Sequence, residues 1–208
     1  NGFLSSNYRG TTFRSSGDPV LHVSNPDGVT PRIQRLRLDA IRDLNDSYYR
    51  DNGDAEIAAR IAAYELAFRM QTAVPELADL SKESPETLET YGVNNETTRA
   101  FGTNCLLARR MVERNVRFIQ LYHSTWDDHW DLNVNHQKNC AMTDKPIAAL
   151  LKDLKQRGLL AQTLVVWGGE FGRQPTAEYA VGTGRDHNSY GFTMWIAGGG
   201  IKGGVSVG

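Results

Sequence analysis

The chain has 208 residues, with 23 Lys and Arg against 24 Asp and Glu, so its formal net charge is −1. This balance argues against a protein that binds nucleic acid through a basic surface. Hydrophobic residues make up 40% and charged residues 23%, which is typical of a globular protein and not of a disordered one. No apolar run approaches the roughly 18 residues of a membrane span. Two cysteines, Cys105 and Cys140, cannot form a disulfide scaffold, and their spacing matches no zinc pattern.

The first half of the chain is predicted to be mostly helical. Residues 1–31 are rich in Ser, Gly, Asn and Thr, which indicates a surface loop or a linker, without the pattern of a signal peptide. Apolar residues at helical spacing predict a helix over residues 31–50, and Asp54 is the expected N-cap of a second one. Further helices are expected over residues 84–91 and 97–114.

The second half alternates predicted strands with a helix. Apolar runs predict strands over residues 116–122, 163–167 and 192–197. A helical pattern covers residues 132–156, and we expect Pro146 to interrupt it. A strand, a helical crossover and a second strand are typical of parallel pairing. The prediction is therefore an α/β fold with a mainly parallel sheet flanked by helices and a helix-rich N-terminal half.

Three histidines and three aspartates fall between residues 123 and 136, directly after the first predicted strand. Asp127 and His129 are two residues apart, so on an extended loop both side chains point the same way, toward one divalent ion. The alternative is that the aspartates only cap and form turns.

Two more groups of polar residues adjoin predicted strands. Glu170 follows the second strand among glycines, and Arg173 could clamp a tetrahedral oxyanion through its planar guanidinium. The alternative is a tight turn with a surface ion pair. Asp186 and His187 are adjacent in a glycine-rich loop before the third strand, and either both bind a metal or Asp186 only orients the His187 ring.

Together these groups predict a site of mixed carboxylate and imidazole ligands. Parallel strands would bring the first two groups to one edge of the sheet. Such ligands hold one or two divalent ions that activate a nucleophile and balance the charge of a phosphoryl or sulfuryl group. The expected chemistry is therefore metal-assisted hydrolysis of an ester.

Several blocks of sequence resemble a known family. They are residues 125–129 (Thr-Trp-Asp-Asp-His), 144–151, 159–173, 184–187 and 192–200. In these blocks the chain resembles a bacterial family of exported proteins, a domain of unknown function with the family number 1501. That family is often described as sulfatase-like and is grouped with the alkaline phosphatase superfamily. One departure is Asp128, where several family members have His.

The resemblance implies a fold and a ligand set. Residues 32–208 would form part of an alkaline-phosphatase-like α/β domain, helical over 32–115 and with the sheet and metal site over 116–208. Asp127 and His129 would lie in the first metal-binding loop. Glu170, Asp186 and His187 would complete the ligands of a divalent zinc, calcium or magnesium ion.

The function implied is that of a metal-dependent phosphatase or sulfatase-like ester hydrolase. The chain would hold its C-terminal part, a fragment without the nucleophile, because relatives in the superfamily carry that residue upstream. The substrate would be a small-molecule or polysaccharide phosphate or sulfate ester. Export to the periplasm or cell surface follows from the resemblance alone.

Two other functions are compatible with the same residues. The first is a non-catalytic exported protein that binds a ligand or has a structural role on the same fold. The second is a carbohydrate- or anion-binding module that uses Trp126, Trp130 and Arg173. Bound metal would separate the hydrolase from the non-catalytic protein.

Overall fold

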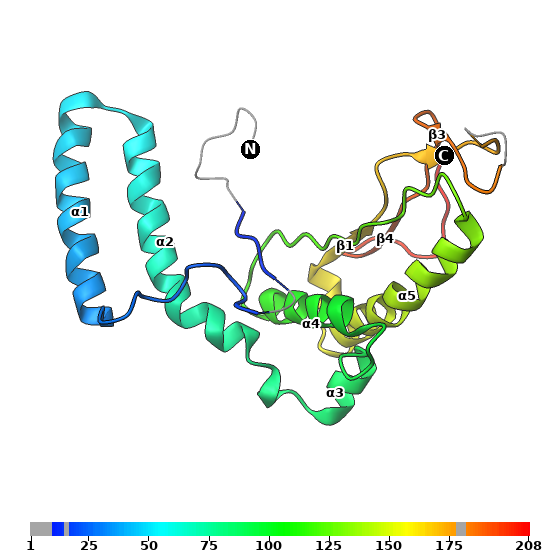
Figure 1. Cartoon of the computed structure of the whole chain (residues 1–208), viewed down its shortest axis with the longest axis horizontal. Helices are drawn as coiled ribbons and strands as arrows, with labels where there is room; N and C mark the ends of the chain where they lie inside the picture. The colour runs from blue at the N-terminus through cyan, green and yellow to red at the C-terminus, as the bar shows by residue number, and fades with distance from the viewer. Residues whose placement is uncertain (1–9, 15–16, 178–181) are drawn as a thin grey trace. The chain divides into compact units, whose positions relative to one another are not determined.

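The computed structural model describes residues 10–14, 17–177 and 182–208 of the chain. These residues form two units, of which the first ends at Lys82 and the second extends from Glu83 to Gly208 (Figure 1). The helices of the first half are present, as the sequence predicted. The sheets of the second half differ from the prediction. Each unit is described by itself.

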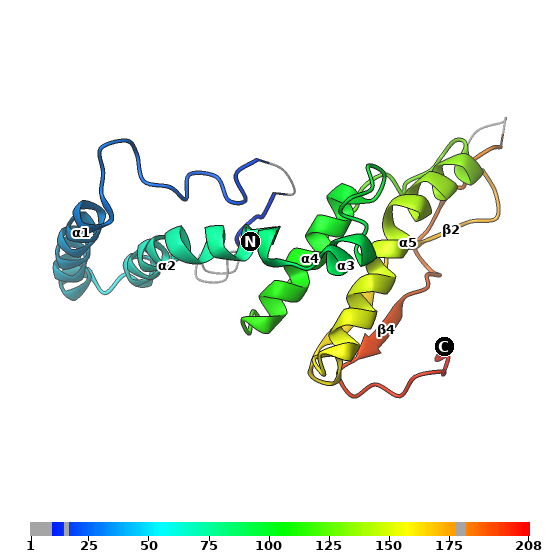
Figure 2. The same ribbon diagram turned by 90° about the horizontal axis from the view of Figure 1, so that it is seen from below.

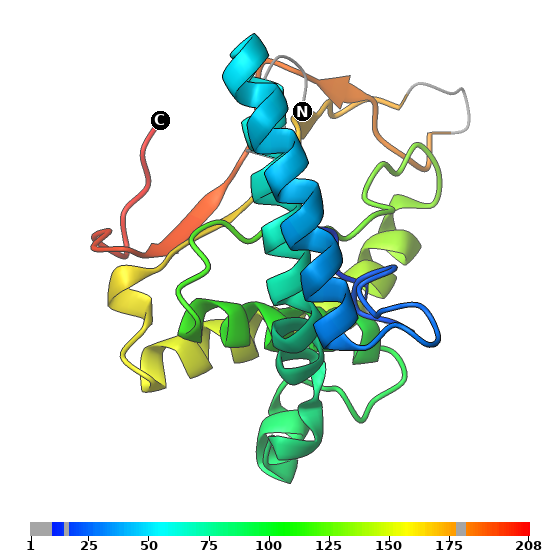
Figure 3. The same ribbon diagram turned by 90° about the vertical axis from the view of Figure 1, so that its left-hand side faces the viewer.

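The first unit is built on a helical hairpin. Helices α1 (Pro31–Asn52) and α2 (Ala55–Ala78) pack side by side along most of their length (Figures 1 and 3). Gly53 ends α1 in the left-handed conformation, with φ of 66°, which costs glycine little because it has no Cβ. Asp54 then caps α2, because its carboxylate accepts a hydrogen bond of 2.9 Å from the amide of Glu56. Both predicted helices and the predicted cap are confirmed.

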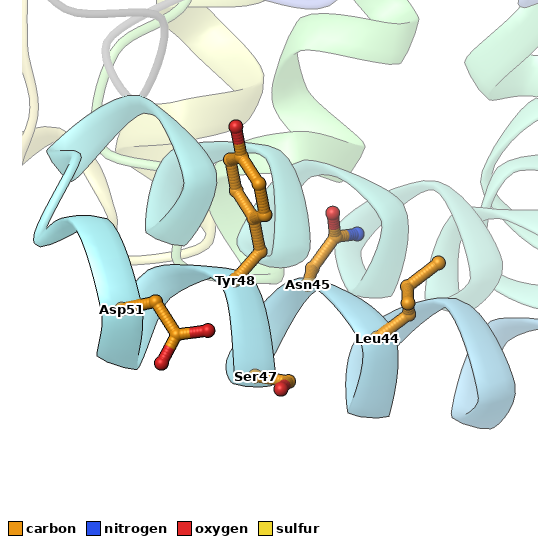
Figure 4. Close-up of a pocket in the computed structure, with 5 residues that line it drawn as sticks. All are labelled: Leu44, Asn45, Ser47, Tyr48 and Asp51. Atoms are coloured by element: carbon orange, nitrogen blue, oxygen red, sulfur yellow. The ribbon is translucent and has the colours of Figure 1, made fainter.

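An ion pair joins the two helices of the hairpin. The guanidinium of Arg35 on α1 makes two hydrogen bonds to Glu65 on α2, of 2.6 and 2.9 Å, and lies 4.9 Å from the ring centre of Phe68. On its other side α1 is open to solvent and carries a shallow pocket (Figure 4). That pocket is lined by Leu44, Asn45, Ser47, Tyr48 and Asp51, none of which is a predicted site residue.

The second unit packs three helices around a small apolar core. After the short 3₁₀ turn Leu80–Lys82 come α3 (Pro85–Thr90), α4 (Arg99–Glu113) and α5 (Leu132–Gln156), and α4 packs along α5 (Figure 2). The buried apolar residues here include Tyr91, Cys105, Leu106, Ala149 and Leu154. The expected interruption of α5 was wrong. The helix continues through Pro146, whose ring is fully buried, so packing compensates for the backbone hydrogen bond that proline cannot donate.

A buried ion network lies between α4 and its neighbours. Arg109 is only 3% exposed and pairs with Glu83 at 2.6 Å, with Glu113 at 2.8 Å and with Asp153 at 3.1 Å. Arg110 pairs with the other oxygen of Glu83 at 2.8 Å. A buried charge is costly unless it is paired, so the two arginines of α4 need these carboxylates as partners. Because the partners include Asp153 on α5 and Glu83 before α3, the network joins these three parts of the chain.

The strands pair antiparallel, so the predicted parallel sheet and the alkaline-phosphatase-like fold were wrong. Within the described residues there are two sheets of two strands each. Strand β1 (Leu164–Trp167) pairs with β4 (Trp195–Gly198), and the short β2 (Gly172–Arg173) pairs with β3 (His187–Asn188). Parallel pairing needs a long crossover, normally a helix, and the described part of residues 168–194 contains none. The chain therefore turns back after β1, and β4 runs antiparallel to it.

The first predicted strand is also absent. Residues 116–122 belong to no helix or strand, and Phe118 is 92% exposed. An apolar run predicts that a segment is buried, but it does not specify a second strand with which the segment can pair, and a strand requires such a neighbour. The structure pairs β1 with β4 and leaves this run outside the ladder. The other two predicted strands are confirmed as β1 and β4.

Among the described helices, none combines the length and the apolar character that crossing a bilayer requires.

The buried network predicts an unequal cost for two glutamate substitutions. Glu83→Ala should lower the free energy of unfolding by about 3 kcal/mol, because it leaves two buried guanidinium groups without this partner. Glu89→Ala removes an exposed pair with Lys145 and should cost less than about 1 kcal/mol. Urea unfolding followed by tryptophan fluorescence tests this, since all four tryptophans lie in the second unit. Equal costs would show that the network contributes no more than a surface pair.

Candidate metal centre

The centre is built where two short strands pair. In the ladder of β2 and β3, Arg173 lies directly opposite His187. Two further backbone hydrogen bonds extend this pairing, from Gln174 to the carbonyl of Asp186 at 2.8 Å and from Asp186 to the carbonyl of Thr176 at 3.0 Å. The position of His187 relative to Arg173 is therefore determined by main-chain pairing.

Hydrogen bonds attach the loop after residue 126 to the segment before β3. The amide of Arg185 donates to the carbonyl of Asp128 at 3.1 Å, and the amide of Leu132 donates to the carbonyl of Thr183 at 3.0 Å. Gly184 lies against the backbone of His129 so closely that a Cβ at this position would overlap the His129 carbonyl group. These contacts bring residues 127–132 next to residues 183–187, although the two segments are about 55 residues apart in the sequence.

Helix α5 supports the other end of the same loop. Asn139, which is 2% exposed, donates from its amide to the carbonyl of Thr125 at 2.6 Å. Its side-chain oxygen accepts from the Thr125 hydroxyl at 3.0 Å and lies 3.4 Å from Nε2 of His123. Thr125 has φ of 73°, an unfavourable conformation for a β-branched residue, and these bonds help to maintain it.

Three of the predicted ligands converge on one point. Oδ1 of Asp127 lies 3.1 Å from Nε2 of His129 and 2.9 Å from Nε2 of His187. The two imidazole nitrogens are 3.1 Å apart. The three atoms therefore form a nearly equilateral triangle, and within the described residues they make a cluster that could hold a metal ion.

The size of this triangle can be compared with known coordination geometry. In a tetrahedral zinc site with bonds of about 2.0 Å, neighbouring ligand atoms are about 3.3 Å apart. The triangle would have to open by only about 0.2 to 0.4 Å to fit. Two imidazoles and one carboxylate suit zinc or a similar transition ion better than calcium or magnesium, which prefer oxygen ligands. Three protein ligands leave a position open, as in catalytic zinc sites.

Arg173 adds a positive charge at the edge of the triangle. Its Nη2 lies 2.6 Å from Oδ1 of Asp127. The hydrogen bond from His187, followed by that from Arg173, lowers the pKa of Asp127 to about 2. Asp127 is therefore ionised at neutral pH, and the ionised carboxylate is the form that binds a metal.

Glu170 and Asp186 do not belong to the triangle. Glu170 is exposed and lies just before β2. The carboxylate of Asp186 accepts a hydrogen bond of 2.7 Å from the backbone amide of His187. The structure thus brings together Asp127, His129, His187 and Arg173. That Glu170 and Asp186 bind metal stays a prediction.

Two residues with supporting roles were not singled out by sequence reasoning. Gly184 was noted only as part of a glycine-rich loop, although that single glycine permits the contact with His129. Asn139 lies within residues 132–156, for which the sequence predicts a helix but no role for this side chain. A polar residue on the buried side of a helix was the only signal that could have identified it.

Comparison with known proteins places the chain in a family. A family model described as a protein of unknown function, DUF1501, matches residues 1–208. The chain belongs to this family. The family number agrees with the resemblance seen in the motif blocks. No curated protein and no solved structure gives a significant match to the chain.

The triangle predicts that this DUF1501 protein binds one zinc ion. His129→Ala and His187→Ala should each weaken zinc binding by about 100-fold or more, because each removes a direct ligand. Competition with a chromophoric chelator measures the affinity. His22→Asn is the matched control, since His22 is exposed, lies in the first unit and has φ of 57°, which asparagine tolerates. Equal zinc affinity in all variants would exclude the triangle as the binding site.

Gly184 provides a second test that leaves the ligands unchanged. Gly184→Ala should weaken zinc binding by about tenfold or more, because the added methyl group displaces the backbone of His129. Gly203→Ala is the control, since a Cβ there has no atom within 4 Å. Circular dichroism should show that both variants keep their helices. Zinc affinity that is unchanged by Gly184→Ala would contradict the role given to this contact.

Proposed function

We propose that this protein is a zinc-dependent hydrolase of phosphate or sulfate esters. One observation carries the proposal: two imidazoles and a carboxylate face one point, with the guanidinium of Arg173 beside them. A cation site alone would be compatible with a structural ion. The adjacent arginine points instead to an anionic ligand, because guanidinium matches the oxygen atoms of phosphate and sulfate.

Arg173 has hydrogen-bonding capacity left for such a ligand. Its Nη2 pairs with Asp127, whereas its Nη1 is buried and has no hydrogen-bond partner in the described part of the chain. A buried donor without an acceptor is costly, and an oxyanion at the metal would supply the acceptor. Arg173 would then stabilise the charge that develops on the transferred group.

The reaction can be assigned to these groups. A divalent ion held by Asp127, His129 and His187 would supply a Lewis acid and would lower the pKa of a water molecule. Hydrolysis adds the oxygen of water to phosphorus or sulfur, breaks the bond to the ester oxygen and passes a proton to the departing alcohol. Asp127, with its pKa of about 2, acts as a ligand and not as a proton donor at neutral pH. His129 and His187 would hold the ion through their Nε2 atoms.

The type of substrate and the export of the protein are part of the same proposal. The motif blocks resemble those of sulfatase-like proteins. In this proposal, that resemblance applies to the chemistry of the site and not to the fold. The partner would be a small-molecule or polysaccharide ester, as the family resemblance implies. Export of the protein, which the family resemblance implies, is also a proposal, and cell fractionation would test it. The alternative of a non-catalytic binding protein differs by predicting metal and anion binding without turnover.

Hydrolysis of para-nitrophenyl phosphate and para-nitrophenyl sulfate by the zinc-loaded protein tests the function. Arg173→Ala should lower kcat/KM by about 100- to 1000-fold for the ester that is cleaved, and Arg173→Lys should restore only part of it. Zinc content should stay the same. Arg42→Ala, which changes an exposed arginine of the first unit, is the control. Bound zinc and bound phosphate without any turnover would favour the non-catalytic alternative.

A further inference from the structure

A large aromatic side chain is exposed beside the candidate metal centre. Trp130 is 58% exposed, and its ring centre lies 6.1 Å from that of His129, at an interplanar angle of 65°. Tryptophan is the largest apolar side chain, and leaving it in water beside a polar site forgoes the free energy of burial. An exposed tryptophan at this place is therefore a candidate contact for a ligand.

The backbone around Trp130 is held in place by several bonds. The carbonyl of Trp130 accepts a hydrogen bond of 3.1 Å from the side-chain amide of Asn135. The next amide, of Asp131, donates to the hydroxyl of Thr183 at 3.1 Å, and Asp131 has φ of 48°. A side chain on a backbone that is already ordered loses less conformational entropy when it binds a ligand. Trp130 is thus suited to contact a ligand bound at the metal.

Aromatic residues also flank the other imidazole. The ring centre of Phe171 lies 4.5 Å from that of His187. Gly172 packs against the backbone of Gly191 and Phe192, so the loop with the exposed residues Tyr190 and Phe192 adjoins β2. Aromatic rings therefore lie beside both imidazoles of the triangle of Asp127, His129 and His187.

We propose that Trp130 forms a subsite that stacks against a pyranose ring, so that the substrate is a phosphate or sulfate ester of a sugar. This inference rests on the proposed function. The apolar face of a pyranose carries C–H groups that pack on the indole, while its hydroxyl groups stay in water. An aryl group would favour an enclosed apolar pocket that excludes water, whereas Trp130 is more than half exposed. The charged ester group of the same molecule would lie at Arg173 and the metal.

Calorimetric titration of the zinc-loaded protein with hexose 6-phosphate and hexose 6-sulfate tests the subsite. Ethyl phosphate and phenyl phosphate serve as ligands without a sugar ring. Trp130→Ala should weaken binding of the hexose esters by about three- to tenfold and leave ethyl phosphate unchanged. Trp130→Phe should keep most of the affinity. The control is Tyr48→Ala on α1, because Tyr48 is 61% exposed and so matches Trp130 in exposure.

Each other result has a definite meaning. An equal loss for hexose esters and ethyl phosphate would show that Trp130 only supports the loop, and no loss for either would remove it from any binding role. A loss for phenyl phosphate as large as that for the hexose esters would replace the sugar with an aryl group. Each of these results overturns the subsite alone. Failure of the parent protein to bind any of the four anions would overturn both this inference and the proposed function.

Discussion

A single carboxylate oxygen organises the candidate site. Oδ1 of Asp127 lies 2.6 Å from Arg173, 2.9 Å from His187 and 3.1 Å from His129. Three nitrogen-bearing groups approach one oxygen because backbone bonds bring the loop of residues 127–132 to the segment of residues 183–187. Everything proposed for this protein depends on that junction, since neither segment holds a complete set of ligands.

The helices of the second unit support the junction between residues 127–132 and 183–187. Asn139 ties the loop to α5, and the buried pairs of Arg109 hold α4 against the neighbouring elements. The first unit is different in kind. It is a two-helix hairpin whose ordering depends on apolar packing and on the pair of Arg35 with Glu65, and it holds none of the candidate ligands. The chemistry of the protein is therefore assigned to the second unit.

The site chemistry and the fold turned out to be separable. The ligands were expected at the edge of a parallel sheet, yet they meet on a short antiparallel pairing of β2 and β3. Hydrogen bonding across that pairing places Arg173 opposite His187, so two strands of two residues are enough to orient a guanidinium and an imidazole together. A functional proposal for this chain has to be tested on the site, because the fold alone does not imply an activity.

The sequence by itself determined the helices and the identity of most groups at the centre. Capping residues such as Asp54 and helical spacing are local signals, so α1 to α4 were predicted nearly in place. Asp127, His129, His187 and Arg173 could be chosen because their side chains have the right chemistry. Only the tertiary structure decided that the strands pair antiparallel, that Pro146 lies within one continuous helix, and that Glu170 lies outside the triangle. Those features depend on contacts between distant residues, and no local pattern of side chains specifies which distant backbone or side chain will be the partner.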